Sequence, residues 1–228
     1  MRLAKLAAAV AFSAASINAG AASVTLSGST FDVTFDSSLV GLFGTPTIVG
    51  DVISWFPSGS PGFTAQTSSG IAVTNSTFAL QVTAKDGYYL KSFSLSEGGD
   101  YFYFGGDPAG VTASGQLRVT PLPGSTVNSA ITASSAFMPN AFLDFATKDW
   151  SASAPTITLA GGVTAANASI ENILAAYVLG DPGYAFIEKK EAFLTVATVV
   201  PEPSTYATLL AGLGVIGLLI MRQRRDGE

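Results

Sequence analysis

The sequence contains no cysteine and no histidine among its 228 residues. Without cysteine, the chain can form neither disulfide bonds nor thiolate-ligated zinc sites. Without histidine, it lacks the residue on which Ser-His-Asp and Cys-His catalysis, His-ligated metal sites and most proton transfer near neutral pH depend. These absences exclude several large classes of enzyme, and no cofactor is expected.

Charged residues are also scarce. They make up 12% of the chain, against roughly 25% in typical globular domains. The net charge is −5, whereas proteins that bind nucleic acid depend on clustered lysine and arginine. Lys189 and Lys190 are adjacent, but Glu188 and Glu191 flank them, so we interpret this run as the balanced surface of a strand. No nucleic acid partner is expected.

The N-terminus has the pattern of a targeting segment. Arg2 and Lys5 precede an apolar stretch, which ends in small residues around Ala21. This order is typical of a secretory signal peptide. We therefore predict a signal peptide over residues 1–22, cleaved after Ala21 or Ala22.

A second apolar run, from Tyr206 to Met221, lies close to the C-terminus and carries no charge. As a helix it would be about 24 Å long, slightly less than the roughly 30 Å of a bilayer core. Arg222, Arg224 and Arg225 follow it directly. Long arginine side chains can extend the span, and a basic cluster marks the cytoplasmic side. The run is therefore predicted to be a single transmembrane helix with a cytoplasmic C-terminus.

Just before this run, Pro201 and Pro203 flank Glu202. Prolines lack an amide donor and fix φ, so this stretch cannot continue a sheet and is expected to be extended. The triplet, the apolar helix and the arginine cluster, in this order, closely resemble the PEP-CTERM sorting signal, a C-terminal tail recognised by exosortases in Gram-negative bacteria. The resemblance covers residues 200–228. An ordinary linker followed by a membrane anchor is the alternative.

The resemblance implies a role for each part of the tail. Pro201, Glu202 and Pro203 would be the recognition motif, and Arg222, Arg224 and Arg225 would retain the precursor in the inner membrane. An exosortase would then cut nearby, leaving an extracellular or surface-attached product. Proteins with this signal are typically linked to exopolysaccharide and biofilm production.

Residues 23–199 have the alternation of an all-β domain. Apolar side chains recur at every second position from Phe78 onward and again after the Asp86-Gly87 turn, which predicts a β-hairpin from Phe78 to Leu95. Further short alternating runs, separated by turn residues, favour an antiparallel β-sandwich. The segment from Ile170 to Val178 also has apolar residues at helical spacing. The turn residues that follow favour a strand there, with a helix as the alternative.

Carboxylate pairs are the remaining candidates for hydrolysis without histidine. Asp32 and Asp36 would lie about 13 Å apart along a strand, beyond the roughly 5–9.5 Å that glycosidases use. Asp144 and Asp149 flank a loop and are expected to face solvent. We therefore predict that the protein is not an enzyme.

A glycine-rich stretch holds Glu97, Asp100 and Asp107 together with several aromatic residues. The carboxylates resemble ligands for a cation such as calcium, and exposed aromatic rings can stack on sugars. The spacing is not that of an EF-hand, however, and two glycine turns around an aromatic strand are the simpler interpretation. No metal site is predicted, with these three residues as the weak candidate.

The sequence thus predicts a signal peptide (1–22), an antiparallel β-sandwich ectodomain (23–199) and a sorting signal with one transmembrane helix (200–228). The expected function is that of a secreted or surface-attached, non-enzymatic protein of the exopolysaccharide or biofilm matrix. Its expected partners are an exosortase, the inner membrane before processing, and extracellular polysaccharide. The alternative is a carbohydrate-active or calcium-dependent sugar-binding module.

Overall fold

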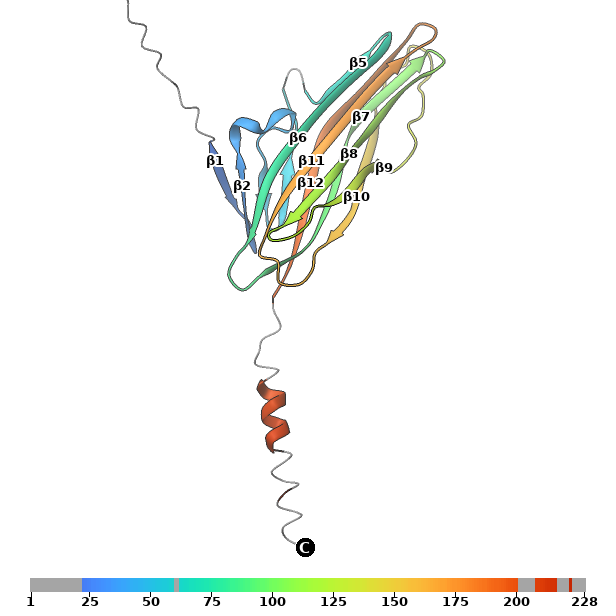
Figure 1. Ribbon diagram of the computed structural model, residues 1–228. Helices are drawn as coiled ribbons and strands as arrows, with labels where there is room; N and C mark the ends of the chain where they lie inside the picture. Colours follow the sequence, from blue (N-terminus) through green and yellow to red (C-terminus); the bar gives the residue numbers. More distant parts are fainter. Residues whose placement is uncertain (1–21, 60–61, 201–207, 217–221, 223–228) are drawn as a thin grey trace, which may run out of the picture.

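The structure is a computed structural model that describes residues 22–59, 62–200, 208–216 and 222. Strands make up most of the described chain (Figure 1). Twelve strands form within the described residues: β1 (Ser23–Ser27), β2 (Phe31–Asp36), β3 (Thr47–Val49), β4 (Val52–Trp55), β5 (Thr64–Thr67), β6 (Gly70–Ala84), β7 (Tyr89–Gly105), β8 (Ala109–Pro121), β9 (Val127–Ala133), β10 (Lys148–Thr158), β11 (Ala165–Val178) and β12 (Gly183–Val199). Two 3₁₀ turns, η1 (Ser37–Leu39) and η2 (Gly41–Phe43), follow β2.

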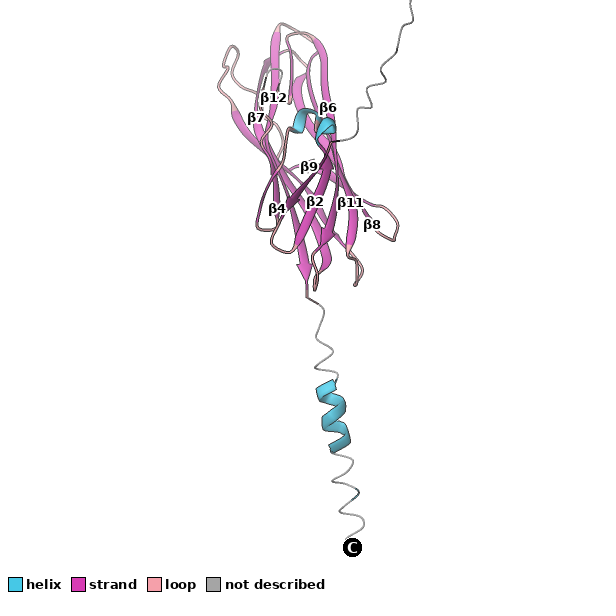
Figure 2. Ribbon diagram, turned by 90° about the vertical axis from the view of Figure 1, so that its left-hand side faces the viewer, coloured by secondary structure: helices cyan, strands magenta, loops and turns pink. Residues whose placement is uncertain are grey.

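The strands form one antiparallel sheet in the order β1-β2-β6-β11-β8-β9-β10-β7-β12-β4-β3, and β5 also pairs with β12. This sheet folds over into two facing layers, so that β11 packs against β12 without pairing with it. The two ends of the sheet approach each other, since the amide of Ser29, after β1, donates to the carbonyl of Gly50, after β3, at 3.0 Å. Figure 2 shows the resulting elongated, nearly closed sandwich. The predicted all-β antiparallel fold is therefore confirmed.

The core lies between the layers and follows the predicted alternation. Strand β11 buries every even-numbered side chain from Ala166 to Val178. The segment considered as a helix is therefore a strand, and its helically spaced apolar residues divide between two faces. Ile170 and Leu174 are in the core, whereas Ile173 and Tyr177 lie on the outer face and are half-buried.

The predicted hairpin from Phe78 to Leu95 is wrong in its pairing. Strands β6 and β7 do form on either side of the Asp86-Gly87 turn, but they are not neighbours in the sheet. β6 pairs with β2 and β11, while β7 pairs with β10 and β12. The turn carries the chain from one layer to the other. Alternation reveals which face of a strand is buried, but it does not reveal which strand binds its edges.

Glycines permit close backbone approach at an irregularity between β7 and β12. The register shifts between Lys189 and Glu191, opposite Gly98 and Gly99. A Cβ atom added to Gly99 would overlap the carbonyl oxygen of Glu188. Such a bulge bends the strand and re-aims its side chains. Here the buried positions of β12 change from odd numbers before the bulge to even numbers after it.

Replacing Gly99 should therefore destabilise the sandwich. In a fragment of residues 22–200, which contains all of the described strands, we expect Gly99→Ala to lower the free energy of unfolding by about 3 kcal/mol, the upper part of the range for overpacking. The overlap is with backbone, which cannot move aside as a side chain can. Urea denaturation measures this difference.

Gly161→Ala is the matched control. No atom lies within 4 Å of a Cβ added there, so the change should be within about 0.5 kcal/mol. Equal stability of the two variants would contradict the close approach seen at Gly99.

Candidate functional site

The C-terminal tail follows directly on the last strand, β12, which ends at Val199. Residues 208–216 are helical, with exposed side chains, and Arg222 is exposed as well. In the parts of the tail that the structure describes, no helix has the length and apolarity needed to cross a membrane. Most of the predicted signal peptide, the motif Pro201, Glu202 and Pro203, and Arg224 and Arg225 lie outside the described residues.

The carboxylates considered for hydrolysis are separately engaged. Asp32 accepts a hydrogen bond from Ser27 and lies 3.8 Å from Lys85. Asp36 accepts hydrogen bonds from the hydroxyl and the amide of Ser38, which lower its pKa. These two acids therefore have different partners and share no site.

The second pair is no closer to a catalytic arrangement. Asp144 accepts a hydrogen bond from the amide of Ala146 within the β9–β10 loop, at 2.9 Å. Asp149 is on β10, in register with Asp100 of β7. Both aspartates are exposed, as predicted.

The structure also separates Glu97, Asp100 and Asp107. Strand β7 continues through this stretch, so Glu97 points into the core and pairs with Lys189, whereas Asp100 pairs with Lys190 at the surface. Asp107 lies in the turn between β7 and β8. Throughout the described ranges, no three acidic side chains gather in a way that could hold a metal ion.

The aromatic residues of this stretch are not available for stacking on a sugar. Tyr101 and Tyr103 face inward, and the Tyr103 hydroxyl donates to the carbonyl of Phe137 at 3.0 Å. Phe102 and Phe104 lie on the outer face, where Phe145 of the β9–β10 loop packs edge-on against both. Their exposed fractions are only 8% and 3%.

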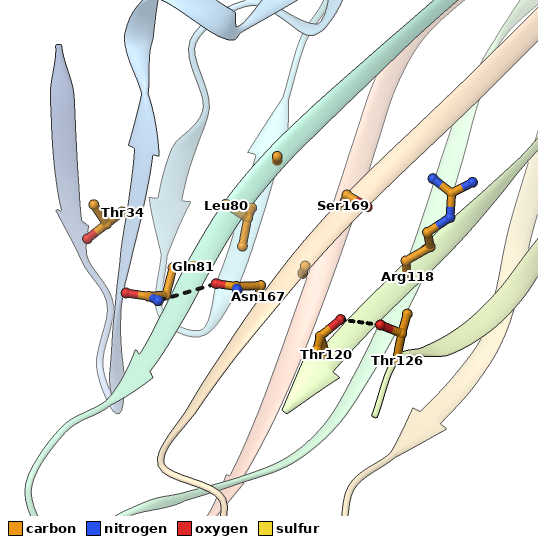
Figure 3. Close-up of a pocket in the computed structure, with 10 residues that line it drawn as sticks. Thr34, Leu80, Gln81, Arg118, Thr120, Thr126, Asn167 and Ser169 are labelled. Carbon is orange, nitrogen blue, oxygen red and sulfur yellow. Dashed lines mark hydrogen bonds between the residues drawn. The ribbon is translucent and has the colours of Figure 1, made fainter. Parts of the chain in front are cut away.

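The outer face of the other layer carries a groove of about 490 Å³, whose lining combines polar side chains with Ala79, Leu80 and Ala168 (Figure 3). It lies across β2, β6, β11 and β8. Gln81 donates to Asn167 at 3.2 Å, and the hydroxyls of Thr120 and Thr126 lie 2.7 Å apart. Arg118 also lines the groove and donates to Glu171 beside it at 2.9 Å. Amides, hydroxyls and one guanidinium suit a ligand rich in hydroxyl groups.

Three polar side chains from three strands form a hydrogen-bonded group in the core. Lys189 on β12 forms an ion pair with Glu97 on β7, and both side chains are 0% exposed. The other oxygen of the Glu97 carboxylate, Oε1, accepts a hydrogen bond from the Asn172 amide on β11 at 2.8 Å. Asn172 is itself fully buried, and its Oδ1 has no hydrogen-bond partner. One carboxylate oxygen of Glu97 therefore accepts from the Lys189 amine, and the other accepts from the Asn172 carboxamide.

Aromatic rings line this buried group. The Lys189 ammonium lies 5.4 Å from the ring centre of Phe43 and 5.5 Å from that of Phe63. Burial in these surroundings lowers the pKa of Lys189 to about 8, and the Glu97 carboxylate opposes the shift.

The sequence interpretation of Lys189 as a surface residue is wrong. Ala185 and Ile187 are buried on β12, and Lys189 continues their alternation into the core. The period of two was visible in the sequence and could have identified the position. The balance of charge around Lys189 and Lys190 obscured it, because only Lys190 is on the surface.

Comparison with known proteins bears on the tail alone. Residues 199–225 match a family model described as the PEP-CTERM protein-sorting motif, which confirms the resemblance seen in the sequence. No curated protein matches the chain.

Two solved structures, of the Gt and Gx strains of infectious bursal disease virus, are similar at 10% and 11% identity, with TM-scores of 0.20 and 0.16. Each match covers 86% of this chain and 60% of the viral chain. Such low scores carry no argument about this protein.

Calcium should leave the sandwich unaffected, because Glu97 and Asp100 are paired with different lysines and the described residues contain no acidic cluster that could hold a metal ion. We expect equal melting temperatures for residues 22–200 in 1 mM calcium chloride and in 1 mM EDTA. A site with a Kd near 10 μM would stabilise the fold by about 2.7 kcal/mol, which corresponds to several degrees. A calcium-dependent rise that Asp100→Asn removes would overturn this expectation.

Proposed function

We propose that this chain, which carries a PEP-CTERM protein-sorting motif at residues 199–225, is a non-enzymatic secreted or surface protein of the extracellular matrix. An exosortase recognises Pro201, Glu202 and Pro203 and processes the tail. The match of the family model to the tail carries this proposal. Exopolysaccharide is the partner proposed for the processed protein.

The arrangement of sandwich and tail supports processing of the folded protein. The matched segment begins at Val199, the last residue of β12, so Val199 is its only residue that belongs to the sheet. Prolines on both sides of Glu202 keep this stretch out of a sheet. An enzyme can therefore reach the motif without unfolding the sandwich.

The proposed topology places the precursor in the inner membrane. The apolar run from Tyr206 to Met221 is its single span, and Arg222, Arg224 and Arg225 remain in the cytoplasm by the positive-inside rule. The sandwich is then on the outer side, where the absence of cysteine makes it independent of disulfide formation.

The proposal of no enzymatic activity rests on chemistry. The sequence lacks histidine and cysteine, and Asp32, Asp36 and Asp144 each accept hydrogen bonds from a different residue. The acidic, sparsely charged ectodomain suits a matrix component more than a catalyst.

Replacing Glu202 tests the sorting proposal. Glu202→Ala removes the one charge of the recognition triplet and leaves the apolar run and the arginines unchanged. In a host with an exosortase, we expect an uncut precursor in the inner membrane, where the wild type gives a shortened, exported form. Fractionation and immunoblotting distinguish the two.

Asp226→Ala is the control, since it removes an acidic residue just beyond the matched segment and should be processed like the wild type. Normal processing of Glu202→Ala would show that the triplet serves only as a linker, which would contradict the sorting proposal.

A sugar-binding module is the second candidate function, and the groove across β2, β6, β11 and β8, with its amide, hydroxyl and guanidinium groups, is the observation in its favour. If the groove binds exopolysaccharide, Arg118→Ala with Asn167→Ala should weaken retention on a gel containing that polymer at least about tenfold, equivalent to about 1.4 kcal/mol. EDTA should have no effect.

Asn75→Ala, on β6 outside the groove, is the matched control and should bind normally. Retention that is equal in all variants would assign polymer binding, if present, to another surface.

A further inference from the structure

We propose that Lys189 and Asn172 become joined by a covalent isopeptide bond, formed within the folded sandwich with Glu97 as the catalytic residue. The inference is independent of the sorting motif. The observation that carries it is the position of one carboxylate between an amine and a carboxamide, all three buried.

The fold brings the three groups together from three strands. Glu97 is on β7 and Lys189 is on β12, its neighbour in one layer, while Asn172 is on β11 in the facing layer. Glu97 Oε2 accepts from the Lys189 amine and Oε1 accepts from Asn172 Nδ2. The attacking nitrogen and the departing nitrogen are thus bound to the same proton acceptor.

Burial increases the share of neutral amine, which is the nucleophile, relative to an exposed lysine. No solvent reaches the side chains of Lys189 or Glu97. In such surroundings an ion pair is costly, and a proton transfer from Lys189 to Glu97 removes both charges. Burial lowers the pKa of Lys189 accordingly.

The reaction balances without a cofactor or an oxidant. Glu97 takes a proton from the Lys189 ammonium, and the freed Nζ attacks Cγ of Asn172 to form a tetrahedral intermediate. The Cγ–Nδ2 bond then breaks as Nδ2 receives the protons carried by Glu97. One C–N bond forms, one breaks, and the nitrogen of Asn172 leaves as ammonium. Glu97 ends as the carboxylate it was at the start.

Glycines on β7 and β8 allow the strands to approach closely here. Gly99 lies against Glu188 and Lys189, and Gly115 on β8 lies against Glu171 and Asn172, where added Cβ atoms would overlap backbone. These two close approaches therefore lie beside Lys189 and Asn172.

A structural ion pair is the competing account, and it leaves two features unexplained. A buried ion pair is seldom more stabilising than apolar packing, and here it is accompanied by an Asn172 Oδ1 with no partner. A buried oxygen without a hydrogen bond costs free energy. Both features are expected of a reactive group that is poised for aminolysis.

Peptide mass spectrometry of the purified, full-length wild type tests the bond. Cleavage after glutamate separates residues 172–188 from residues 189–191, since Glu171, Glu188 and Glu191 border them. We expect the two peptides to remain joined, with a combined mass lower than the sum of the two by one ammonia, about 17 Da. This measurement is unaffected by processing at either end of the chain. Two separate, unmodified peptides from folded protein would overturn the proposal.

Adjacent lysines supply a matched pair of variants. Lys189→Met should abolish the joined peptide, because it removes the nucleophile. Lys190→Met should retain it, because Lys190 pairs with Asp100 at the surface. A joined peptide in Lys189→Met would rule out Lys189 as a partner.

Two further variants test the roles of Glu97 and Asn172. Glu97→Gln keeps the size of the side chain but cannot take the proton, so we expect at least a hundredfold slower joining, with circular dichroism showing a retained fold. If Glu97→Gln formed the bond at the wild-type rate, Glu97 would have no catalytic role.

Asn172→Asp loses water in place of ammonia and yields the same bond. Its joined peptide should therefore have the same mass as that of the wild type, which identifies residue 172 as the partner even if Glu97→Gln does not fold. A joined peptide with any other mass in Asn172→Asp would contradict the assignment.

Discussion

The burial of Lys189 opposite Glu97 is the constraint on which the centre of this sandwich depends. Removing both charges from water costs several kcal/mol for each ion, and the structure offsets that cost with closely placed partners. Asn172 binds the second oxygen of Glu97, and the rings of Phe43 and Phe63 face the ammonium. Phe43 reaches this position from the short η2 turn and also packs against Trp55 and Phe78. The aromatic part of the core is thus organised around a charged pair.

The same constraint accounts for irregularities in otherwise long, regular strands. β12 changes the parity of its buried residues at the bulge beside Lys189, so that Ile187 and Lys189 face the core before it and Ala192 faces the core after it. Without this bulge, one half of β12 would direct its apolar side chains to solvent. The glycines opposite the bulge allow the backbones to approach. One irregularity therefore positions the lysine and also preserves the burial of the rest of the strand.

Much of the fold could be predicted from the sequence, because alternation reports directly on which side chains are buried. It predicted strands within β6 and β7, whereas the strand after Ile170 was favoured over a helix by the turn residues that follow it. The pairing of β6 with β11 could not be predicted, since edge partners depend on distant segments. The tail was recognisable because its signal is local and in a fixed order, whereas the buried group needs three residues from three strands. Lys189 was misinterpreted because its flanking charges outweighed its alternation with Ile187.

Strand β12 connects the two unusual features of this protein. At its C-terminal end it leads into the sorting segment, and in its middle it carries Lys189. A pull on the tail enters the sandwich through β12, whose backbone is hydrogen-bonded to β7, β4 and β5. Such bonds can open one after another from the end of a strand. With the proposed bond in place, opening stops at Lys189 and the load passes to β11, which lies between β6 and β8 in the facing layer. In a chain without cysteine, this cross-link occupies the place that a disulfide would take in many exported proteins.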